Sequence, residues 1–192
     1  MKKIPTLFER KFQEHKVIGI TEDVTPGMEW VLSGEGTATV KIDGSCCAII
    51  VGVFYKRYDA KKGKKAPANA IPCCAPDPVT GHWPHWVPVD FLNAADKWLA
   101  RAYANTPELG DRTYEAIGPH FQGNPYGLSD DILEPHGVKR IQVPRTFDGI
   151  RDYLAHHNIE GIVFWKDGQP QCKIKRSDFS FDWPVKGDES HD

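Results

Sequence analysis

The sequence lacks any long apolar run. Its longest mostly apolar stretch, residues 46–55, is well short of the roughly 20 residues that a membrane-spanning helix needs. The residues near the N-terminus also show no apolar core of the signal-peptide kind. These absences predict a cytoplasmic protein with no membrane partner.

The cysteine patterns of secreted proteins and zinc proteins are missing as well. The 5 cysteines are odd in number, and four of them form the neighbouring pairs 46–47 and 73–74. Disulfide frameworks usually have an even number of cysteines, and structural zinc sites use separated pairs. The pattern therefore favours reduced cysteines in a reducing compartment.

An excess of positive charge is also absent. The formal net charge is −2 and the pI is about 6.4, so the whole chain does not attract nucleic acid. A polyanion would have to be held by a local basic segment. One basic segment contains Lys56, Arg57, Lys61, Lys62, Lys64 and Lys65. It suits an RNA backbone, and a solvated loop explains it equally well.

The length and the distribution of proline predict one domain. A chain of 192 residues is long enough to bury a substantial core, and two full domains would be cramped. We expect residues 1–186 to form this domain and residues 60–80, rich in lysine and proline, to be a loop-rich insertion. Residues 187–192 form a polar tail that we expect to be disordered.

The periodicity of apolar residues predicts a mixture of helices and strands. Helical spacing covers residues 90–105, with Asp90 placed as the N-cap, and residues 148–157. Short alternating segments predict strands at 113–118, 138–143, 161–165 and 171–175. This order favours an α+β fold with antiparallel sheets.

A lysine near position 40 stands in the most informative stretch. Apolar and polar residues alternate from Ala38 to Asp43, which predicts a strand with Lys41 and Asp43 on one face. The following Asp-Gly step suits a tight turn, and the apolar run 46–55 then returns. We therefore expect a hairpin and interpret Lys41 as a nucleophile.

Further charged residues lie on or beside the other predicted strands. Glu115 and Glu160 are separated carboxylates, while Lys173 and Lys175 share one face of their strand. Two neighbouring lysines repel each other, so a phosphate is expected between them. Carboxylates that bind Mg²⁺ and lysines that bind phosphate are suited to a nucleoside triphosphate. A nucleophilic lysine must also lose its proton, which burial and nearby cations favour.

Four of these segments resemble the motifs of one enzyme superfamily. Lys-Ile-Asp-Gly (41–44) is similar to nucleotidyltransferase motif I and Tyr-Glu-Ala-Ile-Gly (114–118) to motif III. Glu-Gly-Ile-Val-Phe (160–164) resembles motif IV and Cys-Lys-Ile-Lys (172–175) motif V. The superfamily contains the ATP-dependent DNA and RNA ligases and the mRNA capping enzymes.

A narrower resemblance is to the 5′-to-3′ RNA ligases of the vertebrate type, and it covers roughly residues 40–181. The segments that carry it are Lys-x-Asp-Gly-Ser-Cys-Cys (41–47), Gly-His-Trp-Pro (81–84) with Trp-Val-Pro-Val (86–89), Gly-Asn-Pro-Tyr-Gly-Leu (123–128), Pro-His-Gly (135–137) and Glu-Gly-Ile-Val (160–163). The resemblance implies a nucleotidyltransferase (adenylation) domain whose antiparallel sheets enclose an ATP cleft.

The resemblance also implies a role for each motif residue. Lys41 would attack the α-phosphate of ATP and become linked to AMP. Glu115 would contact the ribose, and Glu160 would hold Mg²⁺, for which Mn²⁺ is a substitute. The remaining nucleotide-binding residues would be Val40, Ile42, Asp43, Arg57, Lys173 and Lys175, with Arg57 holding phosphate and the two lysines clamping the α-phosphate.

The implied reaction is RNA ligation. AMP would pass from Lys41 to an RNA 5′-phosphate, and an RNA 3′-hydroxyl would then displace it and seal the strand. Arg57 has an alternative interpretation as one of several solvated charges in its basic segment.

The sequence departs from the superfamily pattern in three places. Trp165 stands five residues after Glu160, where many relatives have a lysine. Residues 138–141 carry no aromatic residue that could stack on adenine, for which His136 or Phe147 are substitutes. The chain also ends soon after motif V, so we expect no C-terminal OB domain. A DNA ligase, a guanylyltransferase and a nucleotide- or RNA-binding module without turnover remain as alternatives, and labelling with GTP in place of ATP separates the guanylyltransferase.

Overall fold

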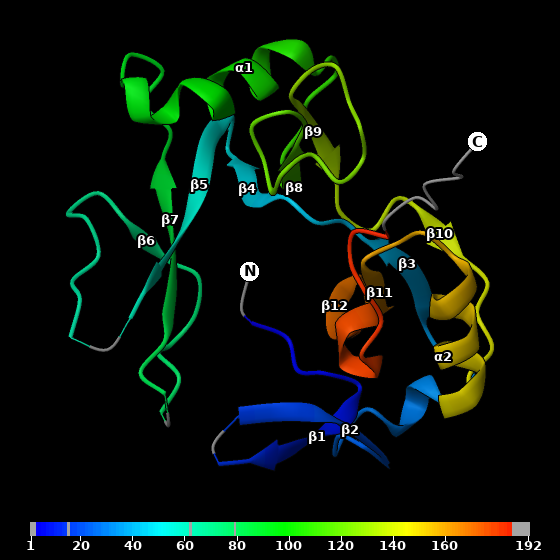
Figure 1. Ribbon diagram of the computed structural model, residues 1–192. Helices are drawn as coiled ribbons and strands as arrows, with labels where there is room; N and C mark the ends of the chain where they lie inside the picture. Colours follow the sequence, from blue (N-terminus) through cyan, green and yellow to red (C-terminus); the bar gives the residue numbers. More distant parts are fainter. Residues whose placement is uncertain (1–2, 15, 62, 79, 186–192) are drawn as a thin grey trace. The chain divides into compact units, whose positions relative to one another are not determined.

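The protein was analysed as a computed structural model that describes residues 3–14, 16–61, 63–78 and 80–185 (Figure 1). The described chain is α+β, with antiparallel sheets and few helices, which agrees with the predicted fold class. It divides into two compact units. Unit 1 is built mainly from Asp43–His136, and unit 2 from Ile4–Ile42 together with residues 137–185.

Unit 2 contains a 4-stranded antiparallel sheet. Its order is β10 (Arg140–Ile141), β3 (Thr37–Lys41), β11 (Gly161–Lys166) and β12 (Gln169–Lys175). The turn between β11 and β12 has positive φ at Asp167 and Gly168, as expected for a two-residue hairpin loop. The helix α2 (Phe147–His156) begins after Thr146, whose hydroxyl accepts a hydrogen bond from the Gly149 N–H.

One face of this sheet forms the core of unit 2. Its buried side chains are Ala38, Ile162, Phe164, Cys172 and Ile174. They pack with Ile150 and Leu154 of α2 and with Leu7, Phe8 and Val31 from the start of the chain. Because side chains alternate along a strand, the opposite face carries the lysines of β3 and β12. The predicted division of β12, with Lys173 and Lys175 on one face and apolar residues on the other, is confirmed.

A second hairpin completes unit 2. β1 (Phe8–Gln13) and β2 (Lys16–Val24) pair with each other, and η1 (Glu29–Val31) follows. The segment before β1 lies beside β12, because the Lys173 N–H donates to the Pro5 carbonyl and the Leu7 N–H donates to the Lys173 carbonyl. The short helix η3 (Arg176–Phe179) follows β12.

Unit 1 contains a 6-stranded antiparallel sheet. In order, its strands are β6 (Ile71–Pro72), β7 (Trp83–Pro88), β5 (Val53–Ala60), β4 (Ser45–Ile50), β8 (Arg112–Ile117) and β9 (Ile132–Pro135). The helices η2 (Ala94–Asp96) and α1 (Lys97–Asn105) are joined end to end. Between β5 and β7, the described residues form loops and the two-residue β6.

The predicted hairpin after Lys41 is wrong. β3 ends at Lys41 and belongs to unit 2, whereas β4 begins at Ser45 in the sheet of unit 1, so the two strands do not pair. Lys41 and Asp43 therefore do not share a strand face. The actual hairpin joins β4 to β5 through Val51 and Gly52, both at positive φ, and the Asp111 carboxylate accepts hydrogen bonds from both of their N–H groups.

Two predicted element boundaries also differ. The strand predicted at 138–143 is reduced to the two residues of β10. The helix predicted from Asp90 begins later, because Asn93 caps η2 by accepting from the Ala95 N–H, while Asp90 accepts a local hydrogen bond from Leu92. The helical segment therefore starts after Asn93 and not, as the sequence predicted, after Asp90. No helix in the described part of the chain has the length and apolar character needed to cross a membrane.

The role of residues 1–186 as one nucleotidyltransferase domain stays a prediction. The predicted disordered tail, 187–192, lies outside the described residues.

Replacing Ile162 by alanine tests the core of unit 2. Its side chain, at the second residue of β11, is fully buried, so Ile162→Ala should lower the free energy of unfolding of this unit by about 2–5 kcal/mol. Its neighbour Val163 lies on the opposite face and is half-buried, so Val163→Ala should cost less than about 1.5 kcal/mol. Amide hydrogen exchange of β11 measures both effects. Equal losses would contradict this assignment of the two faces.

Candidate functional site

An ion pair joins the predicted nucleophile to the predicted metal ligand. The Lys41 ammonium nitrogen lies 2.5 Å from Glu160 Oε2, although the two residues are 119 positions apart in sequence. Lys41 is the last residue of β3, and Glu160 directly precedes β11. Their side chains are 21% and 11% exposed, so the pair is largely shielded from solvent.

The two lysines of β12 lie on the same face of the sheet as Lys41. Gly161 pairs with Lys41 on one side and with Lys175 on the other, and Val163 pairs with Lys173. Paired residues on antiparallel strands project from one face. A side chain at Gly161 would meet the backbone of Ile174 at 2.3 Å, so this central position stays without a side chain between Lys41 and Lys175.

Lys173 shows the electrostatic character of this face. Burial, followed by the positive charges of Lys41 and Lys175, lowers its pKa from 10.5 to about 8, against the opposing effect of Glu160. We call Lys41, Glu160, Lys173 and Lys175 the lysine cluster. With three basic groups and one carboxylate, it has an excess of positive charge that a phosphate group would neutralise.

The lysine cluster contains a single carboxylate that could bind a metal ion, that of Glu160. Among the described residues there is no group of three or more histidine, cysteine, aspartate or glutamate side chains that could hold a metal. Mg²⁺ is commonly bound through one or two carboxylates together with substrate phosphates and water. Glu160 therefore fits Mg²⁺ when phosphate and water complete its coordination, and it does not fit a metal held by protein groups alone.

Glu115 lies in unit 1 and is paired with a residue that the sequence suggested for a different role. His136 Nε2 is 2.8 Å from Glu115 Oε2, and its Nδ1 is 3.0 Å from the Thr113 hydroxyl. Gly44 packs closely here, since an added Cβ would lie 2.9 Å from Glu115 Cγ. The Asp43 N–H donates to the Tyr126 hydroxyl at 2.6 Å. Unit 1 thus places residues from motifs I and III side by side.

Arg57 in β5 has an internal anionic partner. Its Nε lies 2.8 Å from Asp59 Oδ1, and His82 Nε2 lies 3.3 Å from the other oxygen of Asp59. Burial opposes ionisation of Asp59, but the hydrogen bonds and charges of Arg57 and His82 outweigh it and lower the pKa of Asp59. A phosphate at Arg57 would have to compete with this carboxylate.

The structure thus places the predicted site residues in two sets. Lys41, Glu160, Lys173 and Lys175 come together in unit 2, where Val40 and Ile42 flank Lys41 along the chain. Asp43, Arg57 and Glu115 belong to unit 1. The roles proposed for all nine residues in binding or catalysis stay predictions.

His136 and Phe147, the two substitutes for an aromatic residue that stacks on adenine, have different surroundings. Phe147 packs against Phe8 and Phe179 in the core of unit 2, with ring centroids 4.9 and 5.4 Å apart, so it is an unsuitable stacking residue. His136 contacts Glu115 instead, a pairing that sequence spacing did not predict. Trp165 was also missed: its indole N–H donates to the Thr39 hydroxyl at 2.8 Å, on the face that carries Lys41.

The cysteines are poor alternative nucleophiles. All five are free, and burial raises the pKa of the Cys46 and Cys172 thiols to about 12. Burial also raises the pKa of Cys47. A protonated thiol is a weak nucleophile, so Lys41 remains the better candidate.

Comparison with known proteins points to RNA ligases. No protein-family model matches the chain. RNA ligase 1 of Danio rerio is 26% identical to it, over 92% of this chain and 77% of that protein. RNA ligase 1 of Rattus norvegicus is 25% identical and that of Pongo abelii 24%, each over 77% of this chain and 68% of the relative. These similarities support a relationship to the RNA ligase family.

The lowered pKa of Lys173 predicts how stability depends on pH. Because the folded pKa is about 8 and the ordinary value is 10.5, the unfolded chain binds more protons in this interval. The contribution of Lys173 to the free energy of unfolding should therefore rise as the pH rises from 8 to 10.5 and be least favourable below pH 8. Lys173→Met should remove this rise.

Urea titrations across this interval measure the effect, and NMR of the labelled lysine side chain gives the titration midpoint. Lys166→Met is the matched control, since Lys166 is a partly exposed lysine of β11 that pairs with Glu35. Lys175→Met should raise the pKa of Lys173, because a neighbouring cation is lost. A Lys173 midpoint above about pH 10 would contradict the prediction.

Proposed function

We propose that the protein is an ATP-dependent RNA ligase with a nucleotidyltransferase fold and an ATP-binding cleft. The observation that carries the proposal is the lysine cluster, in which the pairing of β3, β11 and β12 brings Lys41, Glu160, Lys173 and Lys175 onto one face. The similarity to proteins named RNA ligase 1 supports RNA as the substrate.

In the first step, the neutral amine of Lys41 attacks the α-phosphorus of ATP. A bond forms between Lys41 Nζ and phosphorus, while the bond from the α-phosphorus to the bridging oxygen of the β-phosphate breaks. Pyrophosphate leaves with the electron pair, and the nitrogen loses its proton. Glu160 Oε2, at 2.5 Å from Nζ, is within reach of that proton.

Lys173 and Lys175 stabilise the charge that develops on the α-phosphate. Both lie on the face of Lys41, and the close spacing of the three basic groups means that an anion relieves their mutual repulsion. Glu160 would hold Mg²⁺ or Mn²⁺, which supplies charge neutralisation at the phosphates.

The proposal also keeps the nucleotide-binding roles that the resemblance implies for residues of unit 1. Glu115 accepts a hydrogen bond from the ribose, with His136 holding its carboxylate in place. Arg57 contacts phosphate after exchange with Asp59. Val40, Ile42 and Asp43 adjoin the nucleophile along the chain and border the nucleotide.

The second and third steps act on RNA. An oxygen of the RNA 5′-phosphate attacks the phosphorus of the lysyl-AMP, the bond to Lys41 Nζ breaks, and the amine is released. An RNA 3′-hydroxyl then attacks the activated 5′-phosphate and displaces AMP, which closes the phosphodiester bond. A cytoplasmic location is part of the same proposal.

Labelling with ATP tests the first step. Wild-type protein incubated with α-labelled ATP and Mg²⁺ should form an acid-labile adduct, and Lys41→Ala should form none, because the attacking nitrogen is gone. Lys166→Ala should label as the wild type does, since Lys166 pairs with Glu35 away from the cluster. Lys173→Met should slow labelling by about 10²–10³-fold through lost charge stabilisation. An adduct on Lys41→Ala would refute the proposed nucleophile.

Sealing of nicked duplexes tests the RNA substrate. We expect the wild type to seal a nick between RNA ends at least about tenfold faster than the matched DNA nick, because contacts to the 2′-hydroxyl distinguish the two. Lys41→Ala should still seal an RNA end that was adenylylated beforehand, since the third step does not use the Lys41 amine. Gel analysis of the product measures both. Faster sealing of DNA would favour the DNA ligase alternative.

A further inference from the structure

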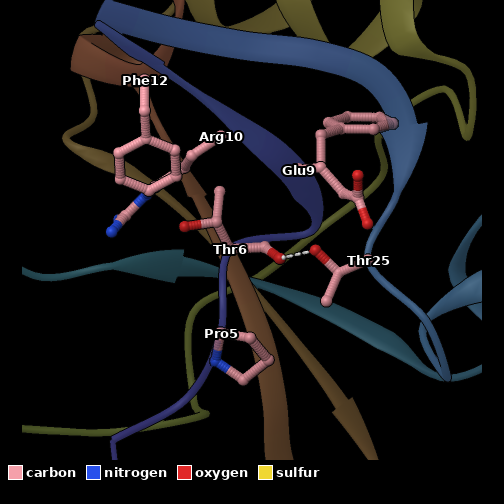
Figure 2. Close-up of a pocket in the computed structure, with 7 residues that line it drawn as sticks. Pro5, Thr6, Glu9, Arg10, Phe12 and Thr25 are labelled. Atoms are coloured by element: carbon pink, nitrogen blue, oxygen red, sulfur yellow. Dashed lines mark hydrogen bonds between the residues drawn. The ribbon is translucent and has the colours of Figure 1, made fainter. Parts of the chain in front are cut away.

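A pocket is formed by β1 and the segments that precede and follow the β1–β2 hairpin. Its volume is about 410 Å³, within the range of roughly 300–1,000 Å³ that is usual for small-molecule sites. The residues that line it are Pro5, Thr6, Phe8, Glu9, Arg10, Phe12 and Thr25. In Figure 2, Phe12, Arg10 and Thr6 are drawn on one side, with Glu9 and Thr25 on the other. All of these residues belong to unit 2.

The floor of the pocket is tied to Lys173 by the backbone. Lys173 exchanges hydrogen bonds with Pro5 and Leu7, and Thr6 forms a bridge with it. The Thr25 hydroxyl donates to the Thr6 carbonyl at 2.7 Å and holds this segment from the other side. The charge of Arg10 also contributes to the lowered pKa of Lys173, after burial and the neighbouring lysines. The segment that contributes Pro5 and Thr6 to the pocket therefore runs beside β12 at Lys173.

The lining combines two kinds of contact. Phe12 is 65% exposed, an unusual position for a large apolar side chain, and Pro5 adds further apolar surface. Arg10 supplies a guanidinium group and Thr6 a hydroxyl, while Glu9 adds a negative charge. A bare polyphosphate would leave the aromatic ring unused and would be repelled by Glu9. A nucleotide suits this combination, because its base stacks on an aromatic ring and its phosphate pairs with arginine.

The place of the pocket favours RNA over the nucleotide of ATP. β12 is the edge strand of the sheet, and Pro5–Leu7 runs beyond it. Three strand spacings of about 4.8 Å therefore separate the backbone of Lys41 from this segment, roughly 14 Å in all. A ligand that reaches both Lys41 and the pocket must be extended, as a nucleic-acid strand is.

We propose that this pocket binds one nucleotide of the RNA substrate, with its base against Phe12 and its backbone phosphate at Arg10. The inference rests on the proposed function. It assigns RNA contact to the β1–β2 hairpin, a role that is separate from the ATP chemistry of Lys41.

The first test measures RNA binding directly. A 5′-phosphorylated RNA oligonucleotide with 2-aminopurine near its 5′ end serves as the probe, and stacking on Phe12 should quench its fluorescence. Phe12→Ala should abolish the quenching and weaken binding by about 5- to 100-fold, while Phe12→Trp should retain both. Ile18→Ala is the matched control, because Ile18 is 55% exposed on the same hairpin and does not line the pocket.

The second test uses the salt dependence of binding. Arg10→Ala should lower the slope of log affinity against log salt by about 0.7, the value for one lost phosphate contact on a single strand. Lys11→Ala is the matched control, since Lys11 is the next residue of β1, is exposed and does not line the pocket. An equal change in slope for Lys11→Ala would overturn the assignment.

Labelling with ATP separates this inference from the proposed function. Phe12→Ala should form the lysyl-AMP adduct at the wild-type rate and transfer AMP to RNA with a raised half-saturating RNA concentration. If this variant loses adduct formation, the pocket serves ATP and the inference fails. If the wild type forms no adduct, the proposed function fails, while the fluorescence and salt measurements still decide whether the pocket binds RNA.

Discussion

The backbone pairing of β11 with both β3 and β12 keeps the residues of the lysine cluster together in unit 2. The three strands come from opposite ends of the described chain, yet Gly161 pairs with Lys41 on one side and with Lys175 on the other. A slip of one residue would turn the lysines towards the core and the apolar side chains towards solvent. Burial of Ile162, Phe164 and Ile174 therefore maintains the register that gathers the charged groups.

The gathered charges are unfavourable to one another without a ligand. Three lysines share one face with a single carboxylate, and Glu160 is already paired with Lys41. The lowered pKa of Lys173 shows that burial and like charge both oppose its ionised form. A bound phosphate would reverse this balance, because it adds negative charge where the protein has an excess of positive charge. The positive charge of Arg10, which lines the pocket at β1, also opposes the ionised form of Lys173.

Local sequence patterns predicted many of the helices and strands, but they failed where a strand pairs with a segment that is distant in sequence. Alternation and turn residues located the β11–β12 hairpin, and helical spacing located α2 to within one residue at each end. The same reasoning joined β3 to the following strand, because Asp43 and Gly44 are good turn residues. The strands instead found partners elsewhere: β3 pairs with β10 and β11, and β4 with β5 and β8. Turn preference is a small free-energy term beside the pairing of whole strands.

By itself, the sequence determined the α+β class, the alternating faces of β12 and the residue types of the candidate site, because periodicity and side-chain chemistry are local properties. Only the tertiary structure decided that Lys41 contacts Glu160, that His136 contacts Glu115 and that Arg57 contacts Asp59. It also brought the charge of Arg10 close enough to lower the pKa of Lys173. Most of these contacts join side chains that are far apart in sequence, and their geometry depends on strand register and burial across the whole unit.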